Sequence, residues 1–382
     1  MIFTHAIDFS ILRGAVELEP TAHGLLPHRL PAWARQQCPD PQLMMVEAQP
    51  AGVRLAFSTE ATVIALDTLR TYRVYAGMPA RPAGVYDLLI DGALAAQASS
   101  DGGNVMAINL ATGTVDTTPG LAGTVRFAGL PARAKHIELW LPYNETTELI
   151  ALRTDAPIAP VASRSTWLHH GSSISHGSDA ASPSTTWPAL AALQRGWELT
   201  NLGFGGSALL DPFVARVMRD TPADRISVKI GTNLVNLDVM RLRAFGPAVH
   251  GFIDTIREGH PTTPLLIVAP ILCPIHEDTP GPTLPDVSAL REGILRFRAT
   301  GKAAEKAAGK LTLSTIRAEL QRIVAQRAPT DPQLFYLDGR TLFGEADAQA
   351  LPLADNLHPG AAAHRGIGER FAQLAFSAAP SA

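Results

Sequence analysis

Short apolar runs alternate with longer helical patterns from about residue 166 to the end of this 382-residue sequence, and this alternation constrains the fold more than any other feature. A chain that alternates strands and helices forms a parallel sheet with helices on both faces. The second half is therefore expected to be a three-layer α/β/α domain. Its expected strands cover residues 198–202, 225–230, 264–269 and 334–337, and its expected helices cover 187–195, 237–258, 361–376 and a segment that Ser314 caps and that ends near 327.

The first half has the texture of an antiparallel β protein. Residues 53–58 alternate between apolar and polar side chains, as a half-buried strand does, and residues 43–48 are expected to form another strand. The pair Asp91-Gly92 is typical of a tight hairpin turn. Many short strands between turns predict a β-sandwich of the jelly-roll kind. The expected division is a sandwich domain at 1–155, a proline-rich linker at 156–165 and a second domain at 166–382.

The composition limits the classes of partner and the compartment. The net charge is -3 and no stripe of Lys or Arg is present, which argues against nucleic acid as a partner. We find no signal peptide pattern at the start and no apolar stretch long enough to span a membrane. Cys38 and Cys273 lie far apart in sequence, and free thiols are the default expectation. The expected location is the cytoplasm.

The segment His170-Gly171-Ser172-Ser173-Ile174-Ser175-His176-Gly177 is a candidate nucleophile loop. A serine hydroxyl is a poor nucleophile until a base takes its proton. The segment Asp355-Asn356-Leu357-His358-Pro359-Gly360 offers such a base, because an Asp three residues before a His can accept the imidazole Nδ1–H and leave Nε2 for the serine. The alternative is that Asp355 caps a helix and His358 lies on the surface.

Two further segments offer donors for an oxyanion. Residues 201–207 contain Gly206 in a glycine-rich turn, and residues 231–234 contain Asn233 with a side-chain amide. Each alone is compatible with an ordinary turn between a strand and a helix. All four segments, however, follow expected strands at their carboxyl ends, where the sites of open α/β sheets assemble. They are therefore expected to meet at one edge of the sheet.

With these four segments, residues from about 166 to 378 resemble the SGNH (GDSL-type) hydrolase superfamily. The resemblance implies a flavodoxin-like fold, with Ser173 as the nucleophile, His358 as the base and then the acid, and Asp355 as the residue that orients His358. It implies an oxyanion hole made by the main-chain N–H groups of Ser173 and Gly206 with the amide of Asn233. The family usually carries Asp directly before the nucleophile, whereas this chain has Ser172. Ser172 therefore stays open as an alternative nucleophile.

The first half resembles, more loosely, the β-sandwich domain that precedes the catalytic domain in certain two-domain carbohydrate esterases. Residues 84–88 and 141–144 carry this resemblance. It implies that the front domain can line the rim of the active site, so Tyr143 and Asn144 are candidates for substrate contact, with packing at a strand end as the alternative. His276 is a third candidate, in a proline-rich loop that would form either a pocket wall or plain surface.

The expected activity is hydrolysis of a carboxylic ester through an acyl-enzyme, with a short acyl group, acetyl above all, on a carbohydrate or similar polar alcohol. The alternatives are a lysophospholipase, a thioesterase, a broad short-chain carboxylesterase or a non-catalytic carbohydrate-binding protein. The reaction needs no cofactor. No metal site is expected either, because His169 and His170 are adjacent on a strand and lack a third ligand at suitable spacing. The front domain leaves assembly into a homo-oligomer open.

Overall fold

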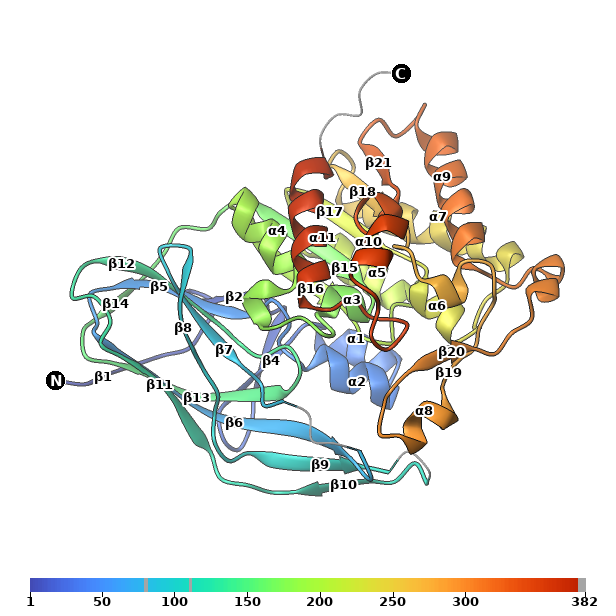
Figure 1. Cartoon of the computed structure of the whole chain (residues 1–382). Coiled ribbons are helices and arrows are strands. Elements are labelled where there is room, and N and C mark those ends of the chain that lie inside the picture. The colour runs from blue at the N-terminus through green and yellow to red at the C-terminus, as the bar shows by residue number, and fades with distance from the viewer. Residues whose placement is uncertain (79–81, 110–111, 377–382) are drawn as a thin grey trace.

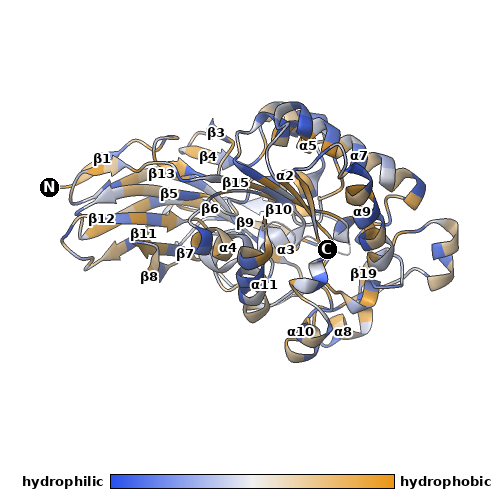
Figure 2. Cartoon of the chain, turned by 90° about the horizontal axis from the view of Figure 1, so that it is seen from above, coloured by the Kyte–Doolittle hydropathy of each residue, from blue (hydrophilic) through white to orange (hydrophobic). Residues whose placement is uncertain are grey.

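The structure is a computed structural model that describes residues 1–78, 82–109 and 112–376. Figure 1 shows an N-terminal lobe of long strands, coloured blue to teal, and a C-terminal lobe in which helices surround a sheet. Seen from above, the two lobes lie side by side (Figure 2).

The C-terminal lobe is built on a five-stranded sheet of β15 (Thr166–Gly171), β16 (Glu198–Gly203), β17 (Arg225–Lys229), β18 (Leu265–Val268) and β21 (Leu334–Leu337). The order is β16-β15-β17-β18-β21, and every pairing is parallel. Along the chain this is the order 2-1-3-4-5 of flavodoxin-like folds, whose ligands bind at the carboxyl ends of the first and third strands. The expected α/β fold is confirmed, and β15 and β17 flank the edge at which a site is expected.

The helices of this lobe are α3 (Ser173–His176), α4 (Trp187–Arg195), α5 (Pro212–Asp220), α6 (Thr232–Asn236), α7 (Leu242–Gly259), α8 (Val287–Arg291), α9 (Leu313–Arg327), α10 (Glu345–Ala350) and α11 (Ala361–Leu374), with short 3-10 turns η1 (Pro183–Thr185), η2 (Pro274–His276), η3 (Ala303–Ala308) and η4 (Gly339–Thr341). Helices α4 and α11 pack together on one face of the sheet, and α5, α7 and α9 pack on the other (Figure 2). The cap of α9 is Thr312, whose side chain accepts a hydrogen bond from the N–H of Thr315. The prediction of Ser314 as the cap is therefore wrong by two residues.

The N-terminal lobe is a sandwich of two sheets. One contains β1 (Phe3–His5), β3 (Glu17–Pro20), β4 (Leu25–His28), β6 (Val63–Tyr75), β9 (Asn104–Ile108), β10 (Val115–Thr118), β11 (Gly123–Ala128) and β13 (Thr146–Thr154). The other contains β2 (Leu12–Arg13), β5 (Arg54–Thr59), β7 (Tyr86–Ile90), β8 (Ala93–Ala98), β12 (Lys135–Trp140) and β14 (Ile158–Pro160). The strand pairs are antiparallel except for β6 with β9. Strand β14 pairs with β5, so part of the expected linker belongs to the sandwich.

Two short helices, α1 (Ala32–Gln37) and α2 (Pro41–Glu47), lie between β4 and β5. The prediction of a strand over residues 43–48 is wrong. Asp40 accepts a hydrogen bond from the N–H of Leu43, and Pro41 occupies the first turn, so the segment begins as a helix. Leu43 and Val46 are then buried in the core of the C-terminal lobe. A segment from the N-terminal half therefore forms part of that core, as Figure 1 shows for α1 and α2.

Arg29 joins the two halves of the chain. Its guanidinium is fully buried and donates to the carbonyl oxygens of Asn201 at 2.9 Å and Gly203 at 2.6 Å, both on β16. It also donates to the carbonyls of Gln49, at 2.7 Å, and Val46. A buried cation is stable only when its N–H groups are bonded, so these carbonyls hold the N-terminal segment against the parallel sheet.

The proline-rich stretch after β18 continues into β19 (Thr283–Pro285) and β20 (Phe297–Ala299), which pair with each other on either side of α8. Figure 1 places this hairpin beside α6, on the side of the lobe that faces the long strands. Cys38 and Cys273 are free thiols, as expected. Within the described ranges, no helix combines the length and apolar character needed to cross a membrane.

Candidate active site

The candidate nucleophile loop follows the carboxyl end of β15, at the edge of the sheet where flavodoxin-like folds bind their ligands. Strand β15 ends at Gly171, Ser172 occupies the cap position and Ser173 is the first residue of α3. The main-chain carbonyl of Ser173 accepts from the N–H groups of Gly177 at 2.9 Å and Ser178 at 3.0 Å. Ser173 is thus fixed in a tight turn between a buried strand and a short helix.

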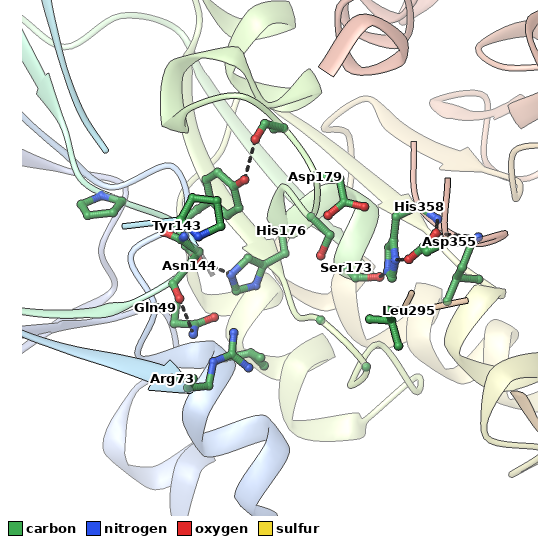
Figure 3. Close-up of a pocket in the computed structure, with 18 of the residues that line it drawn as sticks. Gln49, Arg73, Tyr143, Asn144, Ser173, His176, Asp179, Leu295, Asp355 and His358 are labelled. Atoms are coloured by element: carbon green, nitrogen blue, oxygen red, sulfur yellow. Dashed lines mark hydrogen bonds and ion pairs between the residues drawn. The ribbon is translucent and has the colours of Figure 1, made fainter. Parts of the chain in front are cut away.

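The side chains of Ser173, His358 and Asp355 form a hydrogen-bonded line. The Nε2 atom of His358 lies 2.9 Å from the Oγ atom of Ser173. The Nδ1 atom of His358 lies 2.6 Å from Oδ2 of Asp355. A His that donates from Nδ1 to a carboxylate presents Nε2 as the acceptor for the serine proton. The three residues predicted as a triad are therefore brought together with the geometry that a serine nucleophile needs (Figure 3).

The carboxyl of Asp355 is held in its charged form. Its Oδ1 atom accepts from the N–H groups of Leu357 at 2.8 Å and His358 at 2.7 Å. Burial acts to raise the pKa of Asp355, but the hydrogen bond and charge of His358, together with these N–H groups, outweigh it and keep the pKa below its usual value. The charged carboxylate stabilises the imidazolium that forms when His358 takes a proton.

Gly206 and Asn233 reach the same cavity as Ser173. Gly206 has φ of +77°, a conformation that favours glycine, in the turn after β16. Asn233 is buried in α6, after β17, and its Oδ1 accepts from the N–H of Ala208 at 3.1 Å. With Oδ1 engaged in that bond, Nδ2 is the atom of the Asn233 amide that can donate. The predicted oxyanion donors therefore all line the cavity beside Ser173.

Ser172 does not lie on this cavity's lining. Its side chain is buried, and its Oγ atom has no hydrogen-bond partner. His358, the predicted base, bonds to the neighbouring hydroxyl, that of Ser173. The geometry thus favours Ser173 over Ser172 as the nucleophile, since a serine without a base in reach has nothing to take its proton.

The cavity measures about 750 Å³ and both lobes line it. Tyr143 and Asn144, the predicted contacts from the sandwich domain, belong to the lining, together with Gln49 and Arg73. Figure 3 shows these four residues on one side of His176 and the Ser173–His358–Asp355 line on the other. The ring of His176 bonds to residues of the N-terminal half: its Nε2 atom lies 2.6 Å from the carbonyl oxygen of Tyr143, and a guanidinium nitrogen of Arg29 lies 3.2 Å from its Nδ1.

His276 is not brought to the cavity, so its prediction as a substrate contact is not supported by its position. The ring is buried, with Nδ1 3.0 Å from the carbonyl oxygen of Thr279 and Nε2 2.5 Å from the hydroxyl of Thr283. Both partners belong to its own loop. The imidazole therefore organises the proline-rich stretch instead of facing a substrate.

Several cavity residues were not identified from the sequence, among them Asp179, Leu295 and Phe297. Asp179 follows the nucleophile helix with φ of +65°, in the left-handed region where Asp is enriched. Leu295 and Phe297 come from the segment after α8, which has no motif to mark it. The Phe297 ring meets that of His358 edge-on at 6.2 Å, and its N–H donates to the carbonyl of Asp355 at 2.9 Å. These two side chains give the cavity an apolar wall beside the triad.

Asp179, Asp355 and His358 also form a group whose ligand atoms lie within 4.8 Å of one another, a spacing compatible with a metal ion. In this structure His358 and Asp355 already bond to each other, and His358 bonds to Ser173. These hydrogen bonds already use the ring nitrogens of His358 and Oδ2 of Asp355, which a metal ion would otherwise need as ligands. We therefore describe Asp179 as an acidic side chain on the lining of the cavity.

Each lobe matches a known protein family. Residues 166–273 match the GDSL-like lipase/acylhydrolase family, and residues 10–149 match the family described as the N-terminal domain of SsfX3. No curated protein matches the chain.

Solved structures extend the similarity over the whole chain. The salicylyl-acyltransferase SsfX3 from a tetracycline biosynthetic pathway is 28% identical, with a TM-score of 0.77 over 97% of this chain and 95% of its own. A family two carbohydrate esterase from Cellvibrio japonicus is 14% identical, with a TM-score of 0.56 over 98% of this chain and 97% of its own. The acetyl xylan esterase Est2A from Butyrivibrio proteoclasticus is 10% identical, with a TM-score of 0.55 over the same shares of the two chains. The last two likenesses concern the fold. The C-terminal lobe therefore carries the match to the GDSL-like lipase/acylhydrolase family, a β-sandwich precedes it, and the chain is similar to the SGNH (GDSL-type) hydrolases and is by class an ester hydrolase.

Proposed function

We propose that the chain is a serine esterase that works through an acyl-enzyme, with Ser173 as the nucleophile. The observation that carries the proposal is the Ser173–His358–Asp355 line, with hydrogen-bond distances of 2.9 and 2.6 Å, at the edge of a cavity that Gly206 and Asn233 also line. Nucleophile, base, orienting carboxylate and oxyanion donors are the parts that acyl transfer requires.

In the first step His358 takes the hydroxyl proton of Ser173 through Nε2 while Oγ bonds to the ester carbonyl carbon. The carbonyl oxygen becomes an oxyanion, which the N–H groups of Ser173 and Gly206 and the Asn233 amide stabilise. The C–O bond to the alcohol then breaks, and the imidazolium of His358 gives its proton to the departing oxygen. Water, activated by His358, repeats the sequence and releases the carboxylic acid and Ser173.

The proposed substrate is a short acyl ester, acetyl above all, of a carbohydrate or similar polar alcohol. Leu295 and Phe297 offer an apolar wall close to the triad, whereas Gln49, Arg73 and Asn144 offer polar groups farther away. Tyr143 and Asn144 are proposed as substrate contacts from the sandwich domain. The carbohydrate esterases that share this two-domain fold motivate the choice of alcohol.

A second candidate is transfer of the acyl group to an acceptor alcohol. The similarity to the acyltransferase SsfX3 over 97% of this chain favours it, and a cavity of about 750 Å³ has room for an acceptor. The same acyl-enzyme serves both reactions, and they differ only in whether water or the acceptor alcohol attacks it.

The test compares wild type with Ser173→Ala on p-nitrophenyl esters of rising acyl length, with and without a sugar alcohol. The proposal expects turnover by wild type only, with a steep fall beyond acetyl. A preference for long acyl chains would favour a lysophospholipase. Ester formation on the added alcohol would favour the transferase. If neither wild type nor Ser173→Ala hydrolysed any ester or thioester, the esterase proposal would be wrong and the non-catalytic carbohydrate-binding alternative would be favoured.

A further inference from the structure

A carboxylate from the sandwich, Asp87 on β7, is buried at the contact between the lobes. It is fully buried, and one of its oxygen atoms, Oδ2, accepts three hydrogen bonds from the C-terminal lobe. The donors are the hydroxyl of Ser182 at 2.5 Å, the hydroxyl of Ser184 at 2.6 Å and the N–H of Ser184 at 2.9 Å. The other oxygen, Oδ1, accepts from Gln97 on the neighbouring strand at 2.7 Å. The charge thus faces a segment of the other lobe.

The segment that Asp87 holds, residues 177–186, connects the nucleophile helix α3 to α4. At its start, the N–H groups of Gly177 and Ser178 donate to the main-chain carbonyl of Ser173. Its middle forms a wall of the cavity, where Ser178, Asp179, Ala180, Ala181, Ser182 and Pro183 line it. The segment is therefore bonded to the nucleophile at one end and to the sandwich at the other.

Two other side chains anchor the same segment. The hydroxyl of Tyr143 donates to the carbonyl of Ala180 at 2.7 Å, and Nε2 of His364, on α11, lies 2.9 Å from the carbonyl oxygen of Ser178. Among these anchors Asp87 is the one with a charge. A hydrogen bond to a charged acceptor is stronger than one between neutral groups, and a buried charge without such bonds is costly.

We propose that Asp87 is a positioning residue, through which the sandwich domain sets the place of the 177–186 segment and, with it, of Ser173. The proposal rests on the proposed esterase function for its kinetic consequence. Nothing in the packing of the sandwich requires a carboxylate there, since three of the four hydrogen bonds go to the other lobe. Small displacements of a nucleophile are costly in rate, because the reacting atoms must be aligned within a fraction of an ångström.

The test compares Asp87→Ala with Asp155→Ala. Asp155 is a control carboxylate in the same lobe that is less buried than Asp87 and whose hydrogen bonds stay within the sandwich. It accepts from the N–H of Thr62 at 2.8 Å, the hydroxyl of Thr62 at 2.5 Å and the N–H of Val63 at 3.0 Å. Asp155 does not line the cavity. We expect Asp87→Ala to lower kcat by at least about tenfold and Asp155→Ala to leave it within about twofold, with each variant assayed well below its own Tm. Asp87→Asn keeps an acceptor oxygen and should restore part of kcat.

Hydrogen exchange separates this proposal from the esterase proposal. The backbone amides of residues 178–182 and of Ser184 should exchange faster in Asp87→Ala than in wild type and in Asp155→Ala, whether or not the protein hydrolyses the chosen ester. Equal kcat and equal exchange in the two variants would overturn the positioning role. If Asp87→Ala does not fold, Ser182→Ala/Ser184→Ala removes both hydroxyl donors and leaves the carboxylate in place. Wild-type kcat in that double variant would overturn the role as well.

Discussion

His358 Nε2 and Ser173 Oγ lie 2.9 Å apart although 185 residues separate them in the sequence. The contact brings together the two ends of the C-terminal lobe's sequence. In chain order, Ser173 follows β15, the first strand of the parallel sheet, and His358 comes after β21, its last strand. The neighbouring hydroxyl of Ser172 is buried without a partner. The two adjacent serines thus differ in their hydrogen bonds, so substitution of Ser173 should lower activity strongly and substitution of Ser172 should change it little.

Ser173→Ala should lower kcat by at least about a thousandfold, because the residual rate then comes only from binding and oxyanion stabilisation. Ser172→Ala should leave kcat within a few-fold of wild type and leave Tm unchanged or higher, since it removes a buried hydroxyl that has no partner. The measurement is steady-state hydrolysis of p-nitrophenyl acetate with a thermal melt of each variant. Loss of activity in Ser172→Ala alone would contradict the assignment of the nucleophile.

Asn233→Ala should lower kcat by about 10²- to 10³-fold with a small change in KM, because an oxyanion donor acts on the transition state. Asn233→Asp keeps an oxygen for the N–H of Ala208 but places a carboxylate against the oxyanion, so its loss should be at least as large. Asn236→Ala, on the same helix and also on the cavity, is the control and should keep most of kcat. An Asn233→Ala variant with wild-type kcat would remove this residue from the oxyanion hole.

Leu295→Ala should shift the preference toward longer acyl chains, because it opens the apolar wall beside the triad. Each methylene that finds apolar contact contributes about 0.8 kcal/mol, so the ratio of kcat/KM for butyrate over acetate should rise by roughly tenfold. Ile294→Ala is the control, since Ile294 is 41% exposed and does not line the cavity. An unchanged ratio in Leu295→Ala would show that this wall contacts no part of the acyl group.

The buried imidazole of His364 predicts that stability falls in mild acid. Burial lowers the pKa of His364 to about 4, so the folded state stays neutral where the unfolded chain, with a pKa near 6.5, already binds a proton. The free energy of unfolding should therefore decrease as the pH falls from about 6.5 to 4, by at most roughly 3 kcal/mol from this residue. His364→Gln should flatten this slope in urea titrations, whereas His23→Gln, at an exposed position, should not. Equal slopes would refute the burial argument.

The parallel sheet and the Asp355–His358 pair have signals that lie close together in the sequence. Strands β18 and β21 are short apolar runs, and Asp355 and His358 are three residues apart. Helix α2 was missed because residues 43–46 are as apolar as a buried strand. The signal for a helix lies just before this run, where Asp40 is the N-cap and Pro41 is the first helical residue.

Contacts made by segments that carry no motif were not predictable. Leu295 and Phe297 reach the cavity only because β20 pairs with β19 and bonds to the Asp355 loop. Asp87 stands in a strand whose pattern gives no hint of a partner in the other lobe. His276 follows a strand end, as site residues do, but its own loop folds back and takes both ring nitrogens.

The guanidinium of Arg29 has a consequence for how the molecule comes apart. Two of its acceptors are carbonyls of β16, so separating the N-terminal segment from the parallel sheet would leave a buried cation with fewer partners and the carbonyls of Asn201 and Gly203 without this donor. Neither lobe can keep its native surface alone, and α1 and α2 would leave a gap in the core of the other. Heating should therefore give a single cooperative endotherm in calorimetry, and not one for each lobe.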